Sequence, residues 1–142
     1  MVAVGVVVVV GVGVGVAVGV VVGVVVAVAV GVTGNPQKRK GDKAEREVAQ
    51  LILDLTGWSA RRKLGAGRHD DQGDIDGVPN TTIQVANYKD VASAIRLKVA
   101  GCVEQQERAG TTHGATFIRR PGGKYIVVLT PEQWATYARE SV

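Results

Sequence analysis

The stretch Gly73 to Asp90, GDIDGVPNTTIQVANYKD, decides the fold. It predicts two short strands joined by a turn at residues 77–80, with alternating side chains along the second strand over residues 81–88. Asp74 and Asp76 fall on the first strand. Such a hairpin sets an acidic side chain at the end of one strand beside polar groups of the next. Oxygen ligands in this arrangement suit a divalent-metal site.

Residues 1–32 contain only Met1, valine, glycine and alanine, and every charged residue lies after position 33. We therefore separate a low-complexity segment, 1–32, from a domain over 33–142. The segment could be a membrane helix, a signal peptide, a disordered elastin-like tail, or a translated repeat upstream of a true start at Val32. Valine and glycine form helices poorly, and no basic region precedes the apolar run. These points favour a mis-assigned start, with the true start at Val32, and after it the disordered tail. A membrane anchor is the least favoured alternative, so a membrane is not expected as a partner.

The charged residues are 17 Lys and Arg against 13 Asp and Glu, which gives a pI near 9.5. This excess suits a polyanionic partner, and it equally suits a solvated basic surface. The single cysteine, Cys102, excludes an internal disulfide and a Cys-rich zinc site. Its apolar helical position predicts a buried thiol in a protein of the reducing cytoplasm.

Apolar residues at helical spacing predict a first helix from Asp42 to about Leu55. Asp42 is its expected N-cap, and residues 33–40 before it form a polar arm that is either a disordered terminus or a phosphate contact. Glu45 lies on the shoulder of the apolar face, where it could reach the edge of the core or complete a capping box with Asp42. Glu47 points further round the helix.

The remaining pattern predicts a strand at 58–62, a flexible basic loop at 63–72 and a second helix from Val91 to about 109–110. A second hairpin follows at 114–120 and 124–129, with turn 121–123. Thr130 and Pro131 begin a last helix, which Trp134, Tyr137 and Ala138 would pack on the sheet. The expected order is α-β-β-β-α-β-β-α, an α/β fold. His69 in the loop is either a general base or a solvated histidine.

Four features, taken in order, resemble the PD-(D/E)XK nuclease superfamily, in particular the archaeal and phage Holliday junction resolvases. They are the RKGxxxER pattern at 39–46, the glycine-rich basic loop, GDI at 73–75 and IQVAN at 83–87. The resemblance covers residues 38–140. It implies a restriction-endonuclease-like mixed central sheet flanked by helices, a bound Mg²⁺ or Mn²⁺, a homodimer, and paired nicks in branched DNA of a recombination pathway. It would make Glu45, Asp74 and Gln84 the catalytic metal ligands, with no small-molecule cofactor.

The chain departs from the family pattern at two positions. Gln84 stands where an acid is usual, although its amide oxygen can still bind a metal. Ala86 stands where the catalytic lysine belongs, and a methyl group polarises neither water nor phosphate. Lys89, three residues on, could replace that lysine, as could Lys98 on the following helix, and we prefer Lys89. Asp76 could add a carboxylate, or it is simply a turn residue.

Three functions compete on this sequence. The first is a metal-dependent DNA endonuclease, in a host cytoplasm if the gene is a phage gene. The second is a DNA-binding module that has lost cleavage with the lysine. The third is an unrelated α/β protein with a membrane-targeting leader. In the first two, the candidate phosphate contacts are basic residues of the arm, the predicted strand and the loop: Lys38, Arg39, Lys40, Arg61, Arg62, Lys63 and Arg68.

Overall fold

A computed structural model describes residues 14–21, 24–31, 35–64 and 72–142. The chain divides into two compact units, Met1–Arg39 and Lys40–Val142. In the first unit, β1 (Val14–Val21) pairs antiparallel with β2 (Val24–Gly31). The described part of the low-complexity segment is thus a pair of strands. No helix in the described ranges is both long and apolar enough to cross a membrane.

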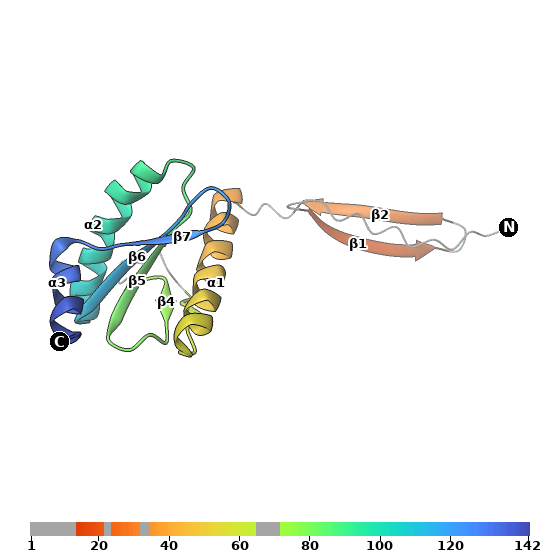
Figure 1. The fold of residues 1–142 in the computed structure, drawn as a ribbon. Coiled ribbons are helices and arrows are strands. Elements are labelled where there is room, and N and C mark those ends of the chain that lie inside the picture. Colours follow the sequence, from red (N-terminus) through yellow and green to blue (C-terminus); the bar gives the residue numbers. More distant parts are fainter. Residues whose placement is uncertain (1–13, 22–23, 32–34, 65–71) are drawn as a thin grey trace. The chain divides into compact units, whose positions relative to one another are not determined.

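The rest of the chain is an α/β fold with three helices and a five-stranded mixed sheet (Figure 1). Its element order is the α-β-β-β-α-β-β-α that the sequence predicts. The elements are α1 (Pro36–Thr56), β3 (Arg61–Arg62), β4 (Ile75–Asp76), β5 (Thr81–Ala86), α2 (Val91–Ala109), β6 (His113–Arg119), β7 (Tyr125–Val128) and α3 (Pro131–Glu140).

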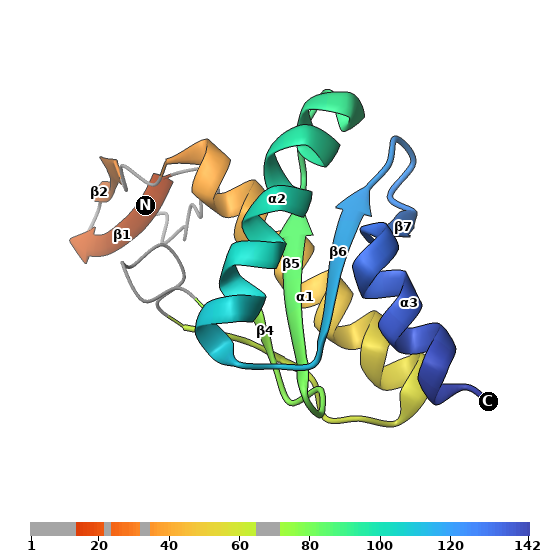
Figure 2. The same ribbon diagram turned by 90° about the vertical axis from the view of Figure 1, so that its left-hand side faces the viewer.

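The strands lie in the order β3-β4-β5-β6-β7, which puts β5 at the centre. β5 and β6 are parallel, and α2 connects them as a crossover; all other neighbours are antiparallel (Figure 2). Because β5 and β6 run the same way, their carboxyl ends meet at one edge of the sheet. Residues after Ala86 and after Arg119 therefore emerge close to each other.

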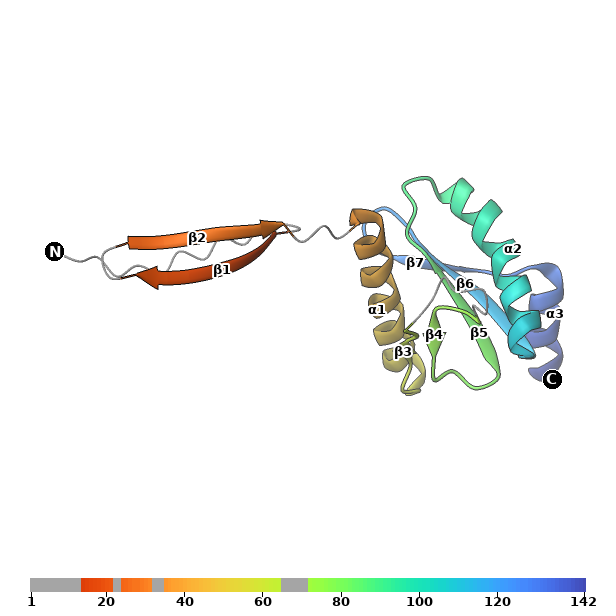
Figure 3. The ribbon, with the colours of Figure 1, turned by 180° about the vertical axis from the view of Figure 1, so that it is seen from behind.

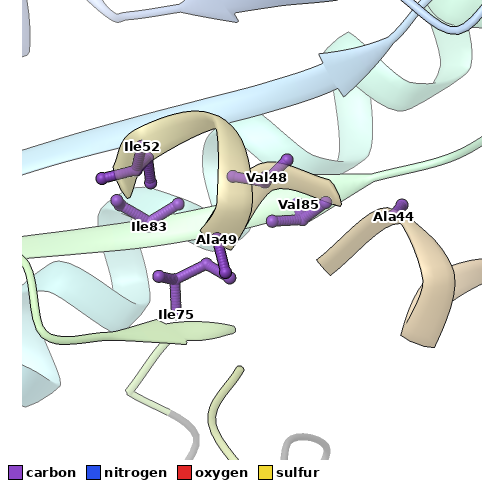
Figure 4. Close-up of a cluster of buried hydrophobic side chains, with 7 residues drawn as sticks. All are labelled: Ala44, Val48, Ala49, Ile52, Ile75, Ile83 and Val85. Atoms are coloured by element: carbon purple, nitrogen blue, oxygen red, sulfur yellow. The ribbon is translucent and has the colours of Figure 1, made fainter. Parts of the chain in front are cut away.

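Each face of β5 packs against a different helix. Toward α1, Ile83 and Val85 join Ile75 of β4 in a cluster with Val48 and Ile52 (Figure 4). Toward α2, Ala86 packs with Ala94 and Ile118. Alternation along the strand therefore sends Gln84, like Ala86, to the α2 side. Burial on both faces explains why the strand is an almost unbroken run of buried residues.

The first helix begins six residues earlier than Asp42, the predicted N-cap, so that prediction is wrong. The side-chain oxygen of Asn35 instead accepts the Gln37 N–H at 3.0 Å, and Pro36 occupies the first turn, where its missing N–H costs no hydrogen bond. Residues 36–40 of the predicted arm are thus helical. The capping box of Asp42 with Glu45 is also absent, because both carboxylates bind Arg62.

Four further expectations need correction. The strand predicted at 58–62 is only Arg61–Arg62, and β5 stops at Ala86 instead of residue 88. Leu55 is exposed at the end of α1. On α3, Trp134 is exposed, and Gln133 is the buried residue because its amide binds the Gln106 side chain and the Cys102 thiol.

Other local predictions are confirmed. The 121–123 turn joins β6 to β7, with Gly122 and Gly123 at positive φ. Thr130 caps α3 with a complete capping box through Gln133. The Cys102 thiol is fully buried, and burial raises its pKa.

Candidate active site

Asp74 lies where β4 begins, tied to the residues on both sides of Gln84. Its N–H donates to the Ile83 carbonyl at 2.7 Å, and its Oδ2 accepts from the Val85 N–H at 2.7 Å. A third bond runs from the Lys63 N–H to the Asp74 carbonyl at 2.8 Å. The carboxylate is buried and fixed against the central strand.

Gly73 is what lets the chain place Asp74 there. Its φ is +107°, a conformation that favours glycine, and a Cβ at this position would lie 3.0 Å from the Ile83 carbonyl oxygen. A side chain would push β4 away from β5 at the point where Asp74 binds. The Gly-Asp pair of the sequence pattern is therefore a steric requirement of this junction.

Gln84 carries a buried oxygen without a hydrogen-bond partner among the described residues. The side chain is only 3 % exposed, and no donor reaches its Oε1. Its cross-strand neighbour on β6 is Thr116, whose hydroxyl oxygen is likewise buried without a hydrogen bond in the described part of the chain. An unsatisfied buried carbonyl costs about 1–3 kcal/mol, so an amide oxygen left in this state is a candidate metal ligand.

Glu45 sits on α1 and is engaged by a cation from the sheet. The Arg62 guanidinium binds Glu45 through Nε and Asp42 through Nη2. The Glu45 hydrogen bond is the main reason why the pKa of Arg62 is raised. Figure 3 shows β3 and β4 beside α1, where this contact is made. Arg62, predicted as a phosphate contact, instead forms ion pairs with these two carboxylates.

The structure does not gather the predicted acids into one cluster. Within the described ranges, no three His, Cys, Asp or Glu side chains are placed to hold a metal ion. Asp76 forms a solvent-exposed ion pair with Arg61 at 3.6 Å. Gln84 is not one of those residue types. The bonds of Asp74 to Ile83 and Val85 place Asp74 and Gln84 on neighbouring strands.

Ala86 stands where the family pattern has its catalytic lysine, and the structure buries this position. Ala86 is 1 % exposed and lies in the cluster under α2. Lys89 is exposed in the turn after β5, whereas Lys98 is half-buried on α2. The Asn87 amide donates to the Lys40 carbonyl at 3.2 Å, which ties the end of β5 to α1 and fixes the backbone from which Lys89 projects.

The predicted phosphate contacts are scattered. Lys38, Arg39 and Lys40 are exposed on the first turns of α1, and Arg61 is exposed on β3. Lys63 is half-buried after β3. Arg68 and His69 lie outside the described residues.

One polar cluster was not anticipated. The Tyr125 hydroxyl donates to Glu47 at 2.7 Å, and Arg119 Nε donates to the same oxygen at 3.1 Å. These bonds lower the pKa of Glu47, the tyrosine hydrogen bond most strongly, and the pKa of Tyr125 is raised by burial and by the Glu47 carboxylate. They join β6 and β7 to α1. Glu47 lies 78 positions from Tyr125, so no local sequence pattern could have revealed the contact.

Fold and site together define an α/β domain with a mixed sheet and a buried aspartate–glutamine pair at the junction of two strands. Comparison with protein families, with curated proteins and with solved structures gives no match.

Proposed function

We propose that the chain is a metal-dependent DNA endonuclease of the PD-(D/E)XK type that cuts branched DNA such as Holliday junctions. The observation that carries the proposal is that Asp74 bonds to Ile83 and Val85, the residues on both sides of Gln84. The buried side-chain oxygen of Gln84 has no hydrogen-bond partner in the described part of the chain. An acid and an amide oxygen on adjacent strands are oxygen ligands of the kind that Mg²⁺ prefers. The observed element order and mixed sheet are compatible with the nuclease fold.

Asp74 and Gln84 would hold Mg²⁺ or Mn²⁺. The family resemblance implies Glu45 as a third ligand, but Glu45 lies on α1, which packs on the face of the sheet opposite Gln84, and its carboxylate binds Arg62. When bound, the cation would polarise a phosphate oxygen and lower the pKa of a water. The chain's own groups have separate tasks. The Val85 N–H orients the Asp74 carboxylate, and Arg62 holds Glu45.

Lys89 is the proposed cation for the charge that develops at the scissile phosphate. It is exposed at the carboxyl end of β5, on a turn anchored by the Asn87 amide. A preorganised positive group at such a position stabilises the transition state more than the bound substrate. The exposed basic residues of α1 and β3 would supply sequence-independent phosphate contacts, and a homodimer would present two such sites to the two strands of a junction.

A second candidate is a DNA-binding module that no longer cuts. It is favoured by Ala86, which is buried in the place of the family's lysine and leaves no room there for a charged side chain. This module would use the same basic surface and would bind junctions without hydrolysing them.

A nicking assay separates the two functions. The full chain is incubated with a labelled four-way junction and with linear duplex of the same sequence, in Mg²⁺, in Mn²⁺ and in EDTA. Symmetric cuts in the junction that need the metal support the endonuclease. A junction that is retarded in a gel but stays intact under every condition selects the binding module, and a junction that is neither bound nor cut rejects both.

A further inference from the structure

Charged side chains are divided unevenly between the two ends of the central sheet. Because β5 and β6 are parallel, one end, the carboxyl end, holds the turn after β5 and the β6–β7 turn (Figure 1 and Figure 2). The other, the amino end, holds the end of α2 and the start of β6. The seven residues of β6 separate the two ends by about 20 Å. Salt at 0.1 M screens exposed charges over about 10 Å, so the two ends are separate electrostatic surfaces.

Exposed cations from three segments lie at the carboxyl end. They are Lys40 on α1, Lys89 after β5, and Arg120 and Lys124 at the two sides of the β6–β7 turn. None of these four forms an ion pair with another residue of the described chain. The Asn87 amide donates to the Lys40 carbonyl at 3.2 Å, so the segments that carry Lys40 and Lys89 are in contact.

The β6–β7 turn is anchored to α1 as well. The Tyr125 hydroxyl donates to the Ala44 carbonyl at 3.4 Å, one helical turn after Lys40. Tyr125 pairs with Arg119 across the strand ladder, so residues 120–124 begin directly beyond this anchor. The three basic segments are therefore held together by the fold.

The acids of the described chain at this end already have partners. They are Asp42, Glu45, Glu47 and Asp90. The first two bind Arg62, and Glu47 binds Arg119. Asp90 caps α2 by accepting from two backbone N–H groups. The unpaired charge at the carboxyl end is thus positive.

At the amino end the exposed charge is mainly acidic. Glu107 and Glu132 line one cavity beside Gly110, where α2 ends. Further exposed acids at this end are Asp54, Glu104 and Glu140, against the two arginines Arg108 and Arg139. A polyanion is therefore attracted to the carboxyl end of the sheet and repelled from the amino end.

We propose that duplex DNA lies across the carboxyl end of the sheet, with Arg120 and Lys124 as phosphate contacts beside Lys40 and Lys89. That the polyanion is DNA rests on the proposed function, whereas the division of charge does not. Cations on rigid segments can meet the regularly spaced phosphates of a duplex and fix its position without reading its sequence. Lys89 is also the cation proposed for the scissile phosphate, so this surface would present the backbone to it.

Two double variants test the surface, each of which removes two positive charges from the full chain. Arg120→Gln/Lys124→Gln changes the carboxyl end, and Arg108→Gln/Arg139→Gln changes the amino end. All four side chains are exposed, so both variants should fold, and their urea midpoints check this. Binding of a labelled four-way junction and of linear duplex is followed by fluorescence anisotropy in EDTA, where metal-dependent cutting cannot occur.

The carboxyl-end variant should bind both DNAs at least about tenfold more weakly at 50 mM salt, since two phosphate contacts are lost. The slope of log affinity against log salt should become shallower by about two units. The amino-end variant should stay within about twofold of the wild type, because its charges are screened from the DNA.

Equal losses in both variants would mean that net charge alone attracts the DNA, and the proposal would be wrong. It would also be wrong if the carboxyl-end variant kept its affinity, or if the wild type bound anionic lipid vesicles and not DNA. The nicking assay tests the proposed function separately. Cutting without any effect of the carboxyl-end variant on binding rejects the surface alone, and a selective loss of binding without cutting by the wild type rejects the endonuclease alone.

Discussion

Asp74 Oδ2 accepts a hydrogen bond of 2.7 Å from the backbone N–H of Val85, so the carboxylate is fixed to the strand that carries Gln84. An asparagine can accept this bond through its amide oxygen, but it lacks the charge that a cation needs. We therefore expect Asp74→Asn to fold normally and to abolish metal-dependent nicking of a four-way junction.

The control for that variant is Asp76→Asn. Asp76 is two residues away, exposed and paired only with Arg61 among the contacts described, so its loss should leave the nicking rate within about twofold. If both variants lose activity alike, charge near the hairpin is required in general, and the specific assignment of Asp74 is wrong.

Lys89 and Lys98 offer a second matched pair. Lys89→Ala should lower the single-turnover nicking rate by about 10²-fold, the usual cost of one preorganised charge at a transition state, with junction binding reduced far less. Lys98→Ala on α2 should keep the wild-type rate. The opposite result would assign the role of the missing lysine to Lys98 on α2.

Substitutions of the two neighbouring arginines of β3 should differ sharply in their effect on the stability of the protein. Arg62 is 26 % exposed in its side chain and serves Asp42 and Glu45, whereas the Arg61 side chain is 79 % exposed and makes one 3.6 Å pair. Arg62→Gln should lower the free energy of unfolding by about 2 kcal/mol, because two carboxylates lose their partner. Arg61→Gln should change it by less than about 0.5 kcal/mol. Urea unfolding measures both, and equal losses would contradict the arrangement.

Tyr125→Phe should give a stability loss that depends on pH. The Tyr125 hydroxyl is the leading cause of the lowered pKa of Glu47, whose ordinary value is 4.5. A carboxyl with a lowered folded pKa stabilises the fold fully above that value and loses the contribution as pH falls through the folded pKa. The variant should therefore be less stable by about 1 kcal/mol near pH 7 and approach wild type near pH 3.

Tyr88→Phe provides the comparison for this pH dependence, since Tyr88 is exposed after the end of β5. Urea midpoints at the two pH values measure the difference between each variant and the wild type. A constant deficit for Tyr125→Phe at both pH values would mean that the hydroxyl acts through its 3.4 Å bond to the Ala44 carbonyl instead of through Glu47.

Local patterns were enough to predict most elements of residues 35–142. The Thr130-Pro131 start, the 121–123 turn and the apolar spacing in α2 are each contained in a few consecutive residues. The start of α1 was missed because residues 37–40 carry no apolar periodicity. The signal was nevertheless present in Asn35-Pro36, an N-cap residue followed by proline.

Only those parts of the site that are formed by residues close together in the sequence could be predicted. Asp74 and Gln84 lie on neighbouring strands because one short hairpin joins them, and that hairpin was predicted from its turn and alternation. The role of Gln84 was implied only by the family resemblance. The partners of Glu45 and Glu47 come from β3, β6 and β7, at positions that only the folded sheet brings near α1. Packing also decided that Trp134 faces solvent while Gln133 is buried, where its amide binds the Cys102 thiol and the Gln106 side chain.

The parallel pairing of β5 with β6 sets the order in which the chain can fold. The β6–β7 hairpin forms from residues close in sequence, but the β5–β6 contact must first bring Asn80 to Thr112, 32 positions away, with α2 between them. Closing that loop costs entropy before any strand hydrogen bond is gained. The docking of α2 onto β5 is therefore the expected rate-limiting step, and substitutions at Ala94 should slow refolding more than substitutions in the 121–123 turn.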